Sequence, residues 1–138
     1  MDTDTLHQLV ASKQHGVLVT IKRDGRPQLS NVVYSFGADD VIRISVTDGR
    51  AKTANLRRDP RASLHVSRDD FWAYAAVEGT ARLLPVAEAP DDPTVDALVE
   101  LYRSVAGEHD DWDDYRRAMV ADRRLVVELP VEHLYGMA

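Results

Sequence analysis

Cysteine is absent from this chain of 138 residues, which excludes disulfides, thiolate metal sites and cysteine nucleophiles. Long apolar runs are absent as well. The stretch 16–21 is far shorter than the roughly 20 residues of a membrane-spanning helix, so we expect no span. The N-terminal residues also lack the basic start and apolar core of a secretory signal, which predicts a cytoplasmic protein.

Basic residues are outnumbered, with 17 lysines and arginines against 23 acidic residues and a net charge of −6. Proteins that bind nucleic acid usually present clustered basic residues, so we expect no nucleic-acid partner. An anionic small molecule would have to meet a local basic patch. The length and the 44% hydrophobic content fit one globular domain that spans residues 1–138.

Familiar catalytic motifs are missing too. The sequence has no G-x-G-x-x-G, no complete phosphate loop, no H-E-x-x-H and no nucleophile elbow. Its five histidines are scattered without the spacing of metal ligands, so we predict no metal site. The acidic run 109–114 is interpreted as a loop whose aspartate caps the following helix.

What the sequence does contain is a series of short segments rich in β-branched residues, separated by turn signals. Five of them predict an antiparallel core, at 16–22, 27–36, 41–46, 62–67 and 72–84, and 124–129 is expected to be the last strand. Asp24-Gly25 predicts a tight hairpin between the first two. Apolar spacing predicts helices at 5–12, 50–58, from Pro93 through Val105 and at 112–121. This pattern is typical of a mainly β barrel.

The segment 48–61 concentrates cations in an otherwise acidic protein. Arg50, Lys52 and the Thr53 hydroxyl would stand at a helix N-terminus, where free N–H groups and the helix dipole favour a phosphate. The same segment equally fits a solvated basic helix face, with Arg57 and Arg58 paired to acids. Spacing alone leaves both interpretations open.

Two features of the predicted strands concern where a ligand could bind. Trp72 and Tyr74 alternate on one predicted strand, so they share a face and either stack on a planar ring or, more commonly, pack in a core or interface. In 27–36, small polar residues fall on both faces, because Ser30 and Asn31 point in opposite directions. Inward polar groups in a barrel usually face a ligand or a solvent gap.

These segments carry a family likeness. The stretches GVLVT (16–20), DGRPQLSNV (24–32) and RAKTANLRRDPR (50–61) resemble the pyridoxamine-phosphate-oxidase-like split-barrel family. WAYA (72–75), the stretch 101–109 and WDDYR (112–116) are similar to its actinobacterial F420-dependent reductases. The resemblance implies a mainly β, FMN-binding split β-barrel, antiparallel and Greek-key-like, that forms a homodimer with cofactor sites at the subunit interface.

The same resemblance implies a set of cofactor-binding residues. The cofactor phosphate would be held by Arg50, Ala51, Lys52 and Thr53. The deazaflavin ring and its ribityl chain would lie against Ser30, Asn31, Val32, Ser45 and Val46. From the other subunit would come Trp72, Tyr74 and Ala75, while Arg57, with Arg58, would meet the polyglutamate tail. No catalytic side chain is expected, because the cofactor performs the hydride chemistry.

The function implied is an F420H2-dependent oxidoreductase that passes a hydride to an unsaturated small molecule. Three alternatives stay open: an FMN-dependent enzyme related to pyridoxamine phosphate oxidase, a non-catalytic F420 carrier, and an interaction module without cofactor. FMN ends in one phosphate, whereas F420 has a longer anionic tail. The extra cations Arg57, Arg58 and Arg61 therefore favour F420.

Overall fold

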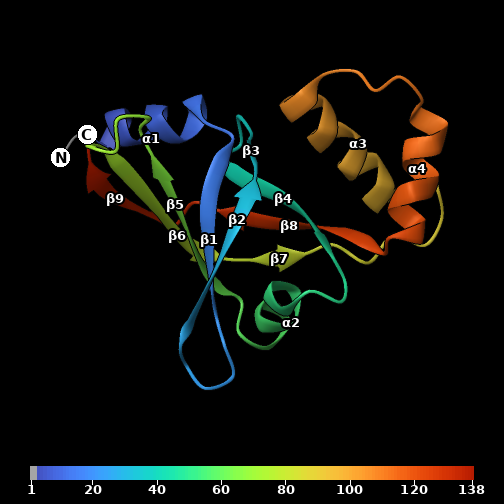
Figure 1. Cartoon of the computed structure of the whole chain (residues 1–138), viewed down its shortest axis with the longest axis horizontal. Coiled ribbons are helices and arrows are strands. Elements are labelled where there is room, and N and C mark those ends of the chain that lie inside the picture. The colour runs from blue at the N-terminus through green and yellow to red at the C-terminus, as the bar shows by residue number, and fades with distance from the viewer. Residues whose placement is uncertain (1–2) are drawn as a thin grey trace.

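Two antiparallel sheets contain the strands of residues 3–138, the part of the chain that the computed structural model describes (Figure 1). The first sheet has the order β2 (Pro27–Val33), β1 (His15–Ile21), β5 (Arg61–Ser67), β6 (Tyr74–Thr80) and β9 (His133–Met137). The second has the order β3 (Ser35–Phe36), β4 (Val41–Thr47), β8 (Arg124–Pro130) and β7 (Arg82–Leu83). The prediction of mainly antiparallel β structure is confirmed.

The barrel core forms where the inward side chains of the two sheets meet. Strand alternation supplies them: Ile42, Ile44 and Val46 of β4 are buried, while the residues between them are half-buried. Helix α1 (Thr3–Ser12) adds Leu6 and Val10 to the same cluster. It begins two residues before the predicted start.

Two predicted strands are broken, and both breaks are corners of the barrel. The prediction of one strand over 27–36 is wrong, because the chain leaves the first sheet after β2 and enters the second at β3. Between them Tyr34 is fully buried, and its hydroxyl donates to the Val10 carbonyl at 2.6 Å. Burial raises the pKa of this phenol well above its ordinary value. The predicted strand over 72–84 divides likewise into β6 and β7, around buried Ala81.

Gly79 of β6 is paired in register with Ala62, and a Cβ there would collide with the Pro130 carbonyl oxygen, so a close backbone approach explains this glycine. One smaller prediction also fails. Segment 124–129 is not the last strand, because β9 follows and pairs with β6 at the edge of the first sheet. Leu134 of β9 packs against the barrel core.

Three further helices connect the strands. Helix α2 (Ala51–Arg58) lies between β4 and β5, while α3 (Pro93–Ala106) and α4 (Trp112–Ala121) lie between β7 and β8. Asp92 and Asp111 cap α3 and α4 by accepting from Val95 N at 2.8 Å and Asp114 N at 3.1 Å. The predicted capping role of the acidic run is thereby confirmed.

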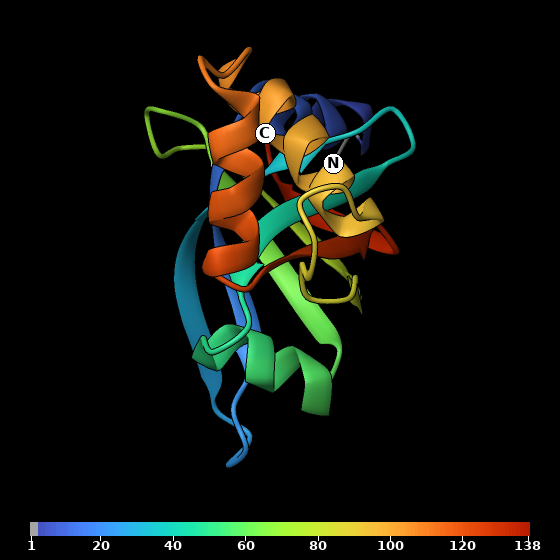
Figure 2. The same cartoon turned by 90° about the vertical axis from the view of Figure 1, so that its right-hand side faces the viewer.

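Helices α3 and α4, here called the helical cover, pack on the outer face of the second sheet (Figure 2). Their contact with that sheet is a second hydrophobic cluster, separate from the barrel core, that contains Leu98, Met119 and Val126. Among residues 3–138, no helix is both long and apolar enough to cross a bilayer.

Candidate functional site

Helix α2 is fixed to the barrel by a buried amide. Asn55 is 6% exposed and donates from Nδ2 to Thr20 Oγ1 at 3.1 Å and to Gln28 Oε1 at 2.9 Å. Its Oδ1 accepts from Arg58 Nη2 at 3.0 Å, and the same nitrogen donates to the Ile21 carbonyl at 2.7 Å. Because buried polar groups stabilise a fold only when paired, this network fixes the position of α2. The inward polar side chain of Gln28 therefore meets the protein's own amide.

Two side chains predicted at the cofactor are engaged within the chain. Thr53 is fully buried, and its Oγ1 donates to the Thr47 carbonyl at 2.8 Å, which uses its only hydroxyl hydrogen. Arg57 Nη1 lies 2.6 Å from Asp48 Oδ1, and Arg123 binds the other oxygen at 3.0 Å. Arg123 and Arg57 hold the pKa of the Asp48 carboxyl below its ordinary value. Thr53 therefore braces the turn before α2, and Arg57 has a carboxylate partner.

Three other cations near the start of α2 form no ion pair within residues 3–138. They are Arg50, Lys52 and Arg124, here called the cation cluster. Burial, Arg50 and Arg124 together lower the pKa of the Lys52 ammonium group. In a chain with a net charge of −6, like charges gathered without a counter-ion would favour the binding of an anion.

Arg124 was not among the residues that the sequence singled out. It is the first residue of β8 and lies opposite Thr47 of β4. Its Nη1 donates to Ser45 Oγ at 3.3 Å. Its Nε is the one buried side-chain nitrogen or oxygen within residues 3–138 that has no hydrogen-bond partner. The sequence signal for it was weak, because Arg123 and Arg124 stand together and nothing distinguishes them.

A cleft of about 440 Å³, here called the helix cleft, lies between the helical cover and the ends of the sheets. Lys52 and Arg124 line it, together with Tyr102 and Tyr115 of the helical cover. Burial raises the pKa of Tyr115, whose hydroxyl donates to the Leu98 carbonyl at 3.1 Å. The lining of the helix cleft therefore combines two cations with two aromatic side chains.

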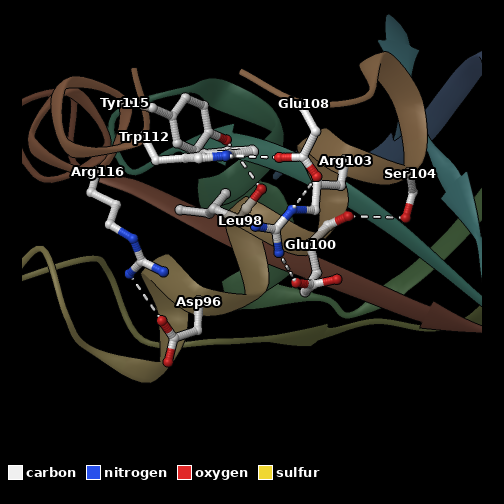
Figure 3. Close-up of polar contacts among 9 residues, drawn as sticks. All are labelled: Asp96, Leu98, Glu100, Arg103, Ser104, Glu108, Trp112, Tyr115 and Arg116. Atoms are coloured by element: carbon white, nitrogen blue, oxygen red, sulfur yellow. Dashed lines mark hydrogen bonds and ion pairs between the residues drawn. The ribbon is translucent and has the colours of Figure 1, made fainter. Parts of the chain in front are cut away.

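Tyr102 and Tyr115 belong to an aromatic cluster between α3 and α4, and Figure 3 shows the Tyr115 hydroxyl directed at the Leu98 carbonyl of α3. Tyr102 meets His109, Trp112 and Tyr115, with ring centroids 5.2, 5.6 and 5.1 Å apart. Trp112 Nε1 donates to Glu108 Oε2 at 2.9 Å, as Figure 3 shows. These contacts keep Tyr102 and Tyr115 in place over the cleft.

A second cleft of about 630 Å³, here called the sheet cleft, lies on the outer face of the first sheet. His15, His65 and Phe71 line it. The two clefts share Asn31, Val32 and Val33 of the edge strand β2. A planar ligand that crosses β2 would therefore reach both.

The helix cleft brings together four of the predicted cofactor-binding residues, namely Asn31, Val32, Ser45 and Lys52. The others lie elsewhere. Val46 and Ala75 belong to the buried barrel core, and Ser30 faces away from Asn31 on β2. Arg50 and Ala51 are exposed at the start of α2.

The prediction that Trp72 and Tyr74 share a strand face is wrong. Strand β6 begins at Tyr74, and Trp72 lies in the preceding loop with 81% of its surface exposed. The Asp70 carboxylate accepts from Trp72 N at 3.0 Å and from Arg68 Nε at 2.9 Å, which closes this loop. Tyr74 instead stacks on His65, with ring centroids 5.2 Å apart.

The two antiparallel sheets and the helical cover define a class of protein, the split β-barrels of the pyridoxamine-phosphate-oxidase type. The chain belongs to the pyridoxamine 5'-phosphate oxidase family, whose model matches residues 2–138. The family resemblance seen in the sequence is thereby confirmed.

Several solved structures share this fold. A conserved hypothetical protein from Mycobacterium tuberculosis is 24% identical, with a TM-score of 0.77 over 99% of this chain and 84% of its own. An F420 reductase is 23% identical, with a TM-score of 0.72 over 94% of each chain. A FAD-binding protein from Mesorhizobium loti is 16% identical, with a TM-score of 0.71 over 99% of this chain and 92% of its own. At these identities the similarity establishes the split-barrel fold.

Proposed function

We propose that this protein is an F420H2-dependent reductase that transfers a hydride to an unsaturated small molecule. The observation that carries the proposal is the cation cluster, which has no carboxylate partner within residues 3–138 and two of whose members line the helix cleft. The reduced deazaflavin supplies the hydride when it is bound. The chain's own residues supply binding and orientation.

The residues present fit such a cofactor. Lys52 and Arg50 would hold its phosphate, since an ammonium and a guanidinium group both bind phosphoryl oxygens. Asn31, Val32 and Ser45 would lie along the ring, because they line the helix cleft beside Lys52. Ser45 Oγ accepts a hydrogen bond from Arg124, so its own O–H is free to donate.

The three arginines that favoured F420 over FMN in the sequence all have partners within the chain. Arg57 pairs with Asp48, Arg58 with Asn55 and the Ile21 carbonyl, and Arg61 Nη2 with Asp59 at 2.7 Å. A polyglutamate tail at Arg57 would have to share that arginine with Asp48. What favours F420 is the similarity in fold to an F420 reductase, together with the local sequence likeness to that branch.

The proposed active form is a homodimer, with the outer face of the first sheet at the interface. Its two edge strands expose large apolar side chains, among them Leu29 at 63% and Met137 at 58%. The loop before β6 adds Phe71 and Trp72, both more than 80% exposed. Exposed apolar patches of this kind mark protein interfaces. Trp72 would then reach the cofactor bound by the partner subunit.

Titrating F420 and FMN separately into cofactor-free protein, with fluorescence detection, tests the proposal. We expect saturable binding of F420 and weaker binding of FMN. Tight binding of FMN alone would replace F420 by FMN in the proposal. Binding of neither would leave an interaction module as the better interpretation.

Turnover separates a reductase from a carrier. F420H2 oxidation is followed by absorbance with a panel of unsaturated and conjugated acceptors. Oxidation that depends on both protein and acceptor supports the reductase. Tight F420 binding without oxidation by any acceptor in the panel would favour a carrier.

A further inference from the structure

Arg124 is half-buried, and its guanidinium group is incompletely paired within residues 3–138. Its Nη1 makes one long hydrogen bond to Ser45, at 3.3 Å, and its Nε makes none although it is buried. A buried charged nitrogen without a partner costs free energy. No ion pair with a described residue offsets that cost.

Its neighbour provides a comparison. Arg123 binds Asp48 Oδ2 at 3.0 Å and is largely exposed, with 66% of its side chain accessible. Arg124 points instead into the helix cleft, where it stands with Lys52. The two arginines therefore differ in what they contact, although they are adjacent in the sequence.

Of the groups near the start of α2, Lys52 and Arg124 are the ones placed to bind an anion in the helix cleft. The Thr53 hydroxyl is buried and already donates to Thr47, and Arg50 stands exposed outside the cleft. Lys52 and Arg124 are the two cations that line the helix cleft, and their repulsion contributes to the lowered pKa of Lys52. An oxyanion between them would remove that repulsion and give Arg124 Nε an acceptor. Arginine suits this role because its planar fork presents two parallel N–H donors.

We propose that Arg124 and Lys52 together bind the phosphoryl group of the cofactor inside the helix cleft, with the Arg124 fork as the second half of the phosphate site. The inference rests on the proposed function, since it assumes a phosphorylated cofactor. It adds a binding residue from β8, and it moves the phosphate from the exposed start of α2 into the cleft.

The test compares Arg124→Gln with Arg123→Gln, a matched loss of one charge at the adjacent position. In fluorescence titrations of F420 and FMN, Arg124→Gln should raise Kd by about 10- to 100-fold, the range expected for a hydrogen bond to a charged group. Arg123→Gln should change Kd less than about threefold, because its partner Asp48 keeps Arg57. Arg124→Lys should fall between the two, since it keeps the charge and loses the fork.

A second readout uses inorganic phosphate as the probe. Phosphate at millimolar concentration should raise the melting temperature of the unaltered protein and of Arg123→Gln, and should raise that of Arg124→Gln much less. Without ligand, Arg124→Gln should melt close to the unaltered protein, because the side chain it removes has so few partners. If that variant does not fold, Arg124→Lys carries the comparison.

Unchanged cofactor affinity and unchanged phosphate stabilisation in Arg124→Gln would overturn the inference. This failure is distinguishable from failure of the proposed function. In the latter, the unaltered protein itself binds neither F420 nor FMN, while the phosphate measurement still reports on Arg124.

Discussion

The outer faces of the two sheets differ in what covers them. That of the second sheet is closed by the helical cover, which buries Leu98, Val99 and Val126 in a cluster of its own. Within residues 3–138, the outer face of the first sheet carries no comparable cluster and exposes apolar side chains along both edge strands. The chain covers one face with its own helices, and the other face is the one that we propose as the dimer interface. Residues of the edge strand β2 line both the helix cleft and the sheet cleft.

Truncating a buried residue of the helical cover should have the largest effect on stability. Leu98→Ala should lower the free energy of unfolding by about 2–5 kcal/mol, because Leu98 is fully buried between α3 and the second sheet. Urea denaturation measures it. The control is Met137→Ala on the open face, where we expect less than about 1 kcal/mol in a monomeric sample, since Met137 is exposed. Equal losses would mean that the two faces are not different in kind.

A second prediction concerns the exposed outer face of the first sheet, which we propose as the dimer interface. Trp72→Ala together with Leu29→Ser should shift the protein from dimer to monomer in sedimentation experiments, because both side chains are more than 60% exposed in the single chain. The secondary structure seen by circular dichroism should not change. A control at Arg117, exposed on α4 and paired with Asp114, should leave association intact when changed to Gln. A monomer in the unaltered protein would show that this face has no partner of its own kind.

At the boundary between the faces, Lys52→Ala should weaken cofactor binding by about 1.5–3 kcal/mol without unfolding the protein, as a lost hydrogen bond to a charged group predicts. Fluorescence titration gives the affinity, and a thermal melt gives the stability. Unchanged affinity would remove Lys52 from the phosphate site. Arg82→Ala, on the second sheet outside the helix cleft, is a control for the loss of charge.

Asn55 tests how α2 is fixed beside that boundary. Asn55→Ala should cost about 1–3 kcal/mol of unfolding free energy, because Thr20 and Gln28 lose a shared buried donor. It should also weaken cofactor binding indirectly, since α2 carries Lys52. Asn55→Asp keeps the size and the acceptor for Arg58, so it separates the role of the amide donor from that of shape. A variant as stable as the unaltered protein would contradict the anchoring role.

The elements of the fold differ in how well the sequence predicted them. Helix α4 and strand β4 were predicted within a residue, because local periodicity and capping residues determine where they begin. The corners at Tyr34 and Ala81 were missed, since the alternating pattern continues across a strand that changes sheets. The exposed loop position of Trp72 was missed for a related reason, because strand pattern does not reveal where hydrogen bonding starts.

The residues of the candidate site differ in whether the sequence alone could predict them. Lys52 was predicted from the cationic segment 48–61 as well as from the family resemblance, and Asn31 and Ser45 were predicted as ring contacts from the resemblance. Arg124 lies 72 positions after Lys52 (124 − 52) and meets it only through the pairing of β8 with β4. Its role depends on tertiary structure, in particular on an Nε that burial leaves without an acceptor. No local pattern encodes that property.

The smallest expected effect is a shift in pH dependence, and it concerns the two cations of the helix cleft. Burial, Arg50 and Arg124 lower the pKa of Lys52, so this ammonium group loses its charge at a lower pH than an ordinary lysine. Phosphate affinity should therefore decline as the pH rises through that lowered pKa, and be fully present below it. In Arg124→Gln one source of repulsion is gone, so the residual affinity should decline at a higher pH. Phosphate titrations across the alkaline range measure both midpoints, and a midpoint that stays fixed would mean that Arg124 does not act on Lys52.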